Sequence, residues 1–148
     1  KRISGRNVRI KPDRTKVVDV NGRMDYINII DVKSRKVLSV IESNTPRFDE
    51  VGKMEMYATL KDGAIDVAVT DKYILTLYDG RTMDDILGRK QKWASLRLYD
   101  WEGNFIKAAQ LPKIGVDYMA YDENSKTAYF LDRQFEKFYR CDLSELLK

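Results

Sequence analysis

Histidine is absent from this chain of 148 residues. Its absence excludes the commonest general base, the Ser–His and Cys–His nucleophile pairs and the imidazole ligands of metal sites. The many aspartates do not replace it, because a carboxylate mechanism needs two groups placed across a bond, which linear spacing cannot show. No D-x-D-x-D-G calcium loop is present either. The sequence therefore predicts no catalytic residue, no metal site and no cofactor.

Several other features are scarce. Cys141 is the single cysteine, which excludes an internal disulfide. No apolar run approaches the roughly 18 residues of a membrane-spanning helix, and no signal peptide is recognisable. The net charge is +4, from 27 basic and 23 acidic residues, and the two signs are interspersed. We expect no transmembrane segment because no apolar run is long enough, and no nucleic-acid partner because no Lys/Arg block suggests a basic patch.

The chain begins at Lys1-Arg2-Ile3, without an initiator Met and close to strand-like sequence. We therefore expect a fragment of a longer polypeptide, the alternative being a trimmed chain. Apolar residues make up 43% and charged residues 34%, a composition typical of globular rather than disordered proteins. A chain of this length can form one ordinary domain with a core of its own.

The stretch from Ala64 to Leu111 shows the local pattern most clearly. It reads AIDVAVTD, KYILTLYDG, an irregular polar piece, ASLRLYDWEGN and FIKAAQL. The period of two and the many β-branched and aromatic residues indicate strands rather than helices. The WEGN turn predicts a tight hairpin. One small sheet of four such strands cannot bury both faces alone, so further layers must pack against it.

Two signatures alternate along the chain and indicate an internal repeat. One is an alternating run closed by Asp and an apolar residue, and the other ends in Asp before a short turn. The first occurs as INIIDV (27–32), LRLYDW (96–101) and FYRCDL (138–143), the second as VRIKPD (8–13), DVAVTD (66–71) and DYMAYD (117–122). Repeats of roughly 40–50 residues with four strands each are typical of β-propeller blades.

We therefore predict an all-β chain of about three four-stranded antiparallel blades, half of a six-bladed propeller. The expected strands are 6–11, 15–20, 25–31, 36–42, 64–70, 73–79, 94–100, 105–111, 115–121, 126–132 and 135–142. One partial propeller domain covers 1–148, with blades at about 1–45, 46–112 and 113–148. The last blade lacks a clear fourth strand. Apolar blade faces would be open at both ends, and the expected partner is the rest of the propeller or a second copy.

The segments that carry this pattern resemble the TolB-like six-bladed β-propeller proteins, abundant among secreted lipoproteins of Bacteroidetes. They read IKPDRTKVV, YINIIDVKSRKVLSV, YILTLYDGR, LRLYDWEGNFIKAAQL, MAYDENSKTAYFLD and FYRCDL. The stretch YDGR followed by an acidic insertion is the most family-like part. The resemblance implies the C-terminal half of such a protein, located at the cell envelope as a periplasmic or surface lipoprotein. A calcium ion held at the propeller axis by several blades stays an open alternative.

Two insertions interrupt the repeat, at 43–63 and 80–93. In an up-and-down sheet both emerge on the same rim, where loops on a rigid scaffold commonly carry function. The second insertion contains a helical turn predicted by capping, Thr82 to Gly88. Its basic and aromatic residues are the candidate ligand-binding residues: Arg81, Arg89 and Trp93. The alternative is a solvated loop without a ligand.

The strand-end aspartates and the cysteine have structural interpretations. Cys141 fills a small space in the core. Backbone N–H groups of turns are satisfied by most of the following aspartates: Asp66, Asp71, Asp79, Asp84, Asp85 and Asp100. The favoured function is a non-catalytic binding or scaffold domain of a cell-envelope protein, with a glycan or a protein as ligand. One alternative is a propeller enzyme, a lactonase or glycan-processing hydrolase, with its catalytic residues in the missing blades. The other is a structural module of a larger assembly.

Overall fold

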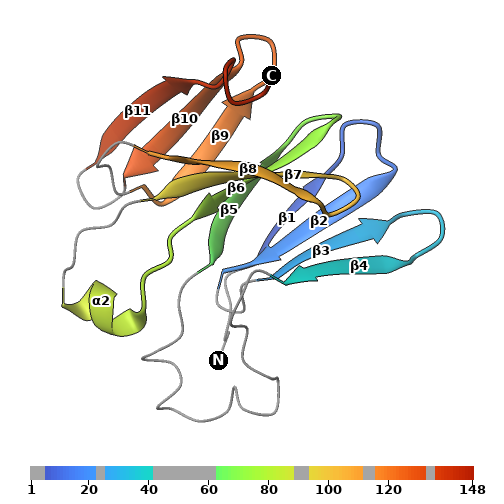
Figure 1. Ribbon diagram of the computed structural model, residues 1–148, viewed down its shortest axis with the longest axis horizontal. Helices are drawn as coiled ribbons and strands as arrows, with labels where there is room; N and C mark the ends of the chain where they lie inside the picture. Colours follow the sequence, from blue (N-terminus) through green and yellow to red (C-terminus); the bar gives the residue numbers. More distant parts are fainter. Residues whose placement is uncertain (1–5, 23–25, 42–62, 89–93, 112–115, 133–135) are drawn as a thin grey trace.

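A computed structural model describes residues 6–22, 26–41, 63–88, 94–111, 116–132 and 136–148. Within these ranges, eleven strands form three antiparallel sheets, and one short helix lies between two strands of the second sheet (Figure 1). No helix in the described part of the chain is long and apolar enough to span a membrane. The expected all-β class with three successive sheets is confirmed.

The strands follow one another in space in their sequence order within each sheet. Sheet one contains β1 (Arg6–Ile10), β2 (Lys16–Asn21), β3 (Tyr26–Asp31) and β4 (Val37–Ile41). Sheet two contains β5 (Ala64–Val69), β6 (Tyr73–Tyr78), β7 (Ser95–Asp100) and β8 (Phe105–Gln110), with α2 (Met83–Leu87) between β6 and β7. Sheet three contains β9 (Tyr118–Asp122), β10 (Thr127–Asp132) and β11 (Lys137–Asp142).

These bounds agree with the predicted strands. The largest difference is at β9, which was expected from residue 115 and begins at Tyr118. Sheet three has three strands within the described residues, as expected for a last blade without a clear fourth strand. The agreement arises because alternation and turn residues are local signals that need no tertiary contact to be recognised.

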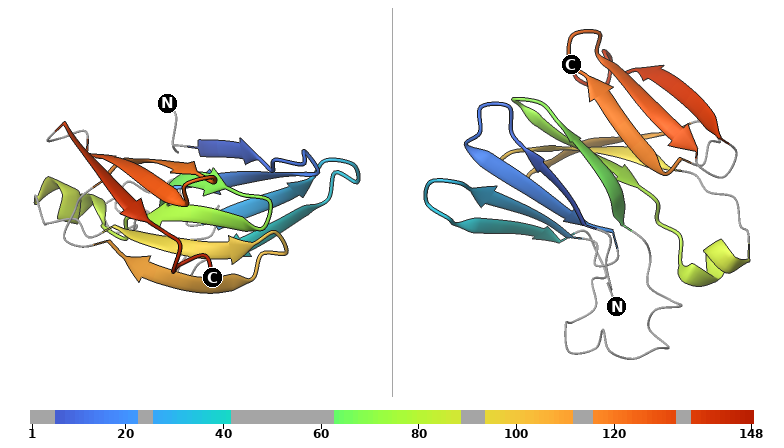
Figure 2. Two further views of the ribbon diagram at one scale, coloured as in Figure 1. Left: turned by 90° about the horizontal axis from the view of Figure 1, so that it is seen from above. Right: turned by 180° about the vertical axis from the view of Figure 1, so that it is seen from behind.

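The first strands of the three sheets lie side by side. Strand β5 contacts β1 on one side and β9 on the other, and the remaining strands of each sheet extend away from this inner row (Figures 1 and 2). Sheet one therefore packs on one face of sheet two, and sheet three packs on its other face. The five hairpin turns, from β1–β2 to β9–β10, lie at one edge of the molecule, here called the hairpin rim (Figure 1). Helix α2 lies at the opposite edge, here called the long-loop rim.

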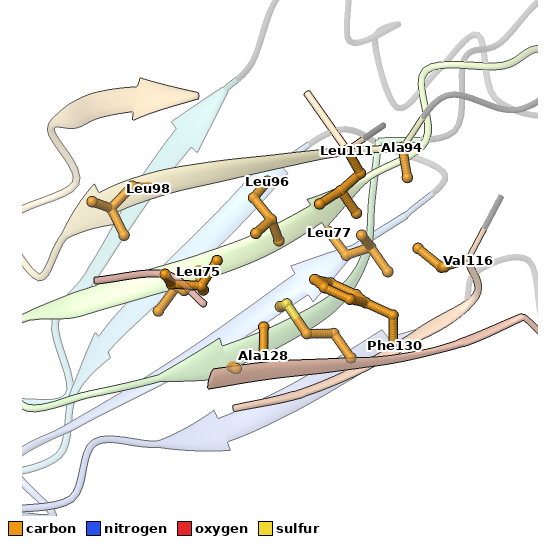
Figure 3. Close-up of a cluster of buried hydrophobic side chains, with 12 residues drawn as sticks. Leu75, Leu77, Ala94, Leu96, Leu98, Leu111, Val116, Ala128 and Phe130 are labelled. Carbon is orange, nitrogen blue, oxygen red and sulfur yellow. The ribbon is translucent and has the colours of Figure 1, made fainter. Parts of the chain in front are cut away.

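Two apolar clusters hold the three sheets together. Between sheets one and two, buried residues of β2 and β3 pack on buried residues of sheet two: Val18, Val20, Ile27 and Ile29 on Ala64, Val67, Ile74, Tyr99 and Trp101. Between sheets two and three, the other face of sheet two packs on Val116, Met119, Ala128, Phe130 and Leu143, and Figure 3 shows part of this cluster. Burying each Val, Leu, Ile, Met or Phe side chain of these clusters stabilises the fold by roughly 1.5–3 kcal/mol.

Both faces of sheet two are buried, so side chains that alternate along its strands point into one apolar cluster or the other and not into solvent. Leu75 on one face of β6 is 1% exposed, and Ile74 and Thr76 on the other face are each fully buried. Cys141 is half-buried in β11 and packs at the edge of the second cluster, which confirms its predicted role as a small core residue.

Aspartates close the strands at the hairpin rim and accept hydrogen bonds from the turns that follow. Asp100 Oδ1 accepts the backbone N–H groups of Glu102 at 2.9 Å and Asn104 at 2.8 Å. Equivalent bonds are made by Asp13, Asp31, Asp122 and Asp142. For Asp13, the bond from the Lys11 ammonium and those from Thr15 lower the pKa to about 2. The predicted turn role is thus confirmed for Asp100, whereas Asp66, for which the same role was predicted, lies within β5 and accepts the N–H of Met119 on β9.

Candidate functional site

The long-loop rim holds the one described residue of the predicted ligand-binding set. Arg81 donates from Nε to Oδ1 of Asp79 at 2.9 Å and from Nη2 to Oδ2 at 3.3 Å. The Asp79 side chain is 4% exposed and the Arg81 side chain 22% exposed. A buried carboxylate held by a bidentate guanidinium is a stable structural pair. Arg81 therefore anchors the start of the loop, while Arg89 and Trp93 lie outside the described residues.

The short helix beside this pair forms as its capping residues predict. The Thr82 hydroxyl accepts the backbone N–H of Asp85 at 3.1 Å, and the Asp85 carboxylate accepts the backbone N–H of Thr82 at 3.1 Å. This reciprocal pair is a capping box. Gly88 closes the turn by donating its N–H to the carbonyl of Asp84 at 2.8 Å. These contacts define the loop's backbone and point to no ligand.

A buried carboxylate connects the three inner strands. Asp66 on β5 is 4% exposed, and its Oδ1 accepts the N–H of Val67 at 2.8 Å. Its Oδ2 accepts the N–H of Met119 on β9 at 2.8 Å, while Arg9 on β1 approaches Oδ1 at 3.4 Å. Asn7 on β1 adds a bond to the carbonyl of Ile65 at 2.6 Å. Each of these contacts joins groups of the protein itself, so this cluster orders the sheets.

A cleft on the hairpin rim has different chemistry. It opens between the β5–β6 turn of sheet two and the β9–β10 turn of sheet three, and the last residues of the chain form its third wall. Its volume is about 470 Å³, which lies within the range of small-molecule sites. The lining residues are Thr70, Asp71, Lys72, Tyr73, Tyr121, Glu123, Lys126, Ser144, Leu147 and Lys148. Three chain segments that are distant in sequence therefore meet around one hollow.

Two lysines of this cleft are available to a ligand. Lys72 and Lys126 form no ion pair with any residue in the described part of the chain, whereas Lys148 pairs with Glu145. Tyr73 and Tyr121 line the same cleft and contribute aromatic surface. Burial, with the negative charges of Glu123 and Asp122, raises the pKa of Tyr121. Cationic heads beside tyrosine rings suit an anionic, hydroxyl-rich ligand.

A second cleft on the same rim contains a lysine that is bonded to other groups of the protein. It lies between sheets one and two, with a volume of about 470 Å³, and its walls include Lys16, Lys36, Trp101 and Glu102. Lys16 donates to the carbonyl of Trp101 at 2.8 Å and to Glu102 Oε1 at 3.0 Å. This lysine therefore ties β2 to the β7–β8 turn. In the described residues, no group of three or more His, Cys, Asp or Glu side chains could hold a metal ion.

Comparisons with known proteins address the fold. No family model and no curated protein matches the sequence. Among solved structures, the WD40 domain of coronin from Toxoplasma gondii superposes with a TM-score of 0.61 at 11% identity, over 95% of this chain and 32% of that chain. The chain is part of a β-propeller. Its three sheets are blades, and it spans about a third of the length of the coronin domain structure.

A second similar structure is the β-propeller domain of Cps50 (Swd1) from Myceliophteria thermophila. It covers 95% of this chain and 54% of that chain at 12% identity, with a TM-score of 0.34, too low to support an argument about architecture. At identities this low, a likeness describes the fold alone. The six-bladed ring and the TolB-like type remain predictions.

The cleft between sheets two and three lies on the hairpin rim, opposite to the long-loop rim that sequence reasoning favoured. Loop length pointed to the long-loop rim, because long insertions are conspicuous in a sequence. The cleft is instead formed by short turns. Lys72 precedes Tyr73 in the β5–β6 turn, and Lys126 is the last residue of the β9–β10 turn. The signal available in the sequence was a lysine in the first hairpin turn of sheet two and another in the first hairpin turn of sheet three. Only the packing of sheet two on sheet three shows that these two lysines line one cleft.

Proposed function

We propose that this chain is a non-catalytic binding module of a β-propeller and that an acidic glycan binds in the cleft between sheets two and three. The observation that carries the proposal is the pair Lys72 and Lys126, which form no ion pair with described residues and line the same cleft as Tyr73 and Tyr121. Lysine ammonium groups bind carboxylates, and tyrosine rings offer apolar faces on which a sugar ring can stack.

We further propose a cellular context from the resemblance of the sequence to TolB-like proteins. The module belongs to a six-bladed ring of a periplasmic or surface lipoprotein at the cell envelope, where acidic glycans are accessible. A scaffold role fits the same fold, because rigid propellers present turns from several blades on one rim. Proteomics of envelope and cytosolic fractions tests the location, and recovery of the protein in the cytosolic fraction alone refutes it.

Binding is tested by calorimetric titration with trigalacturonic acid as the acidic probe and maltotriose as the neutral one. We expect binding of the acidic trisaccharide only, weakening between 50 and 300 mM salt because exposed charges are screened. An ion pair at about 4 Å in water contributes roughly 1 kcal/mol. Lys72→Gln or Lys126→Gln should therefore each weaken binding about fivefold.

The matched control is Lys33→Gln. Lys33 is an exposed lysine in the β3–β4 turn, on the same rim but outside the cleft, and its loss should leave the affinity unchanged. Equal binding of the two trisaccharides, or equal effects of all three substitutions, contradicts an acidic-glycan site in this cleft. Binding of an acidic peptide in preference to the trisaccharide would assign the cleft to a protein ligand instead.

A further inference from the structure

The first hairpin turn of each sheet carries one exposed basic residue. Arg14 lies in the β1–β2 turn, Lys72 in the β5–β6 turn and Lys126 in the β9–β10 turn. Strand β5 contacts β1 on one side and β9 on the other, and each of these strands leads into its turn at the hairpin rim (Figures 1 and 2). The three turns therefore follow one another along the inner part of that rim, and we call their three basic residues the cation row.

The charges of the cation row are not neutralised by pairing. None of its three members forms an ion pair with a residue in the described part of the chain. In the β1–β2 turn, the one carboxylate is Asp13, which accepts hydrogen bonds from the Lys11 ammonium and from the backbone N–H of Thr15 at 2.9 Å. Because this carboxylate is already bonded within its turn, the guanidinium of Arg14 remains available to an anion from solution.

The cleft between sheets two and three contains two of the three members of the cation row. Lys72 and Lys126 line it, whereas Arg14 lies outside its walls. Sheet two lies between sheets one and three, so Lys72 occupies the middle of the row. A ligand that crosses the cleft from Lys126 to Lys72 is therefore directed toward sheet one, where the next basic residue along the inner turns is Arg14.

Two exposed carboxylates lie in the other two turns of the row. Asp71 precedes Lys72 in the β5–β6 turn, and Glu123 lies in the β9–β10 turn. Neither forms an ion pair with a described residue, so each repels an anionic ligand in the cleft and lowers its affinity there. No such free carboxylate opposes an anion in the β1–β2 turn, and a contact with Arg14 should therefore add clearly to the affinity of a ligand long enough to reach it.

We propose that the acidic glycan of the cleft is a polymer and that it continues past Lys72 onto sheet one, where Arg14 binds one of its carboxylates. This inference rests on the glycan site proposed above, and it adds a binding residue and a minimum length of the ligand. A guanidinium suits the role, because its planar fork of N–H groups binds a carboxylate through two parallel hydrogen bonds. Removing one such contact between exposed charges in water should weaken binding about fivefold.

Calorimetric titration of the 148-residue chain with trigalacturonic acid and with a twelve-unit oligogalacturonate tests the proposal, with circular dichroism to verify folding. Arg14→Gln should weaken binding of the long chain about fivefold and leave the affinity for the trisaccharide unchanged, whereas Asp71→Asn should strengthen binding of both. The matched control is Arg35→Gln. Arg35 is an exposed arginine of the same sheet, and its φ of 59° is close to the 62° of Arg14. It lies in the outer β3–β4 turn, so its loss should change neither affinity.

The outcomes separate this inference from the glycan site itself. If the trisaccharide binds through Lys72 and Arg14→Gln leaves the affinity for the long chain unchanged, only the continuation onto sheet one is overturned. If neither ligand binds, the glycan site fails and this inference fails with it. Equal weakening by Arg14→Gln and Arg35→Gln attributes the effect to overall charge and overturns the role of Arg14. Tighter binding of an oligoglutamate with the same number of carboxylates makes the ligand an acidic peptide and overturns the glycan.

Discussion

Two phenylalanines on neighbouring strands of sheet three provide a test of which face of this sheet is the core. Phe130 on β10 is 1% exposed and packs against the leucines of sheet two, whereas Phe138 on β11 is 78% exposed. Truncating a buried Phe to Ala removes its transfer free energy and leaves a cavity, at a cost of roughly 3–5 kcal/mol. Total stabilities are about 5–15 kcal/mol, so Phe130→Ala should remove a large share.

For a chain of this length, about 4 °C in Tm corresponds to 1 kcal/mol. Phe130→Ala should therefore lower the Tm by roughly 12–20 °C, at any protein concentration. Phe138→Ala should change the free energy of unfolding of the isolated chain by no more than about 0.5 kcal/mol. A larger loss is expected only at a concentration at which chains associate through this face. Urea unfolding can be followed by tryptophan fluorescence, because Trp101 is 3% exposed in the folded chain.

Each variant is measured at 0.5 and 50 µM. The reasoning is refuted if Phe130→Ala costs less than about 1 kcal/mol, because the face would then not be packed as the structure shows. It is refuted equally if Phe138→Ala costs as much as Phe130→Ala at the lower concentration, because its face would then be covered within one chain. An unchanged urea m-value confirms that both variants unfold from a similar compact state.

Three further predictions concern single groups. Asp66→Asn removes one acceptor from the inner strands and should cost about 1–3 kcal/mol in urea unfolding, and amide exchange should increase at Met119, whose N–H that carboxylate accepts. Gly103→Ala should destabilise by about 1–3 kcal/mol by calorimetry, because φ is +84° and a Cβ would lie 2.9 Å from Leu38 Cδ2. For Asp13, the folded pKa of about 2 lies below the ordinary value of 3.8, so the stabilisation it provides is present above pH 3.8 and is lost as the pH falls toward 2. Between these two pH values, the Tm of Asp13→Asn should change less than the Tm of the unchanged chain.

Local chemistry decided where the strands and turns lie. Alternating apolar residues placed the strands of the central sheet to within a residue, and the aspartate that closes each third strand marked the repeat. Asp100 shows why such a turn can be predicted from the sequence. Its carboxylate bonds to the N–H groups of Glu102 and Asn104, within the next four residues, so the turn needs nothing from the rest of the chain.

The candidate site could not be located by the same reasoning. Its lysines lie 54 positions apart, at residues 72 and 126, and meet because sheet three packs on sheet two. Sequence reasoning favoured Arg81 on the opposite rim, where the structure shows a guanidinium held by Asp79 at 2.9 Å. A side chain's availability to a ligand depends on what else it contacts, and contacts between distant segments are invisible in the linear order.

The sequence by itself determined the all-β class, the positions of the strands, the capping of α2 and the chemistry of the turns, because each depends on residues only a few positions apart. The tertiary structure alone decided which faces are buried. Ile74 and Leu75 point to opposite sides of one strand, and both are buried because a sheet packs on each side. Phe138 is as apolar as Phe130 yet exposed, because no described sheet covers it. Burial depends on which neighbour is present, and neighbours are set by packing across the whole chain.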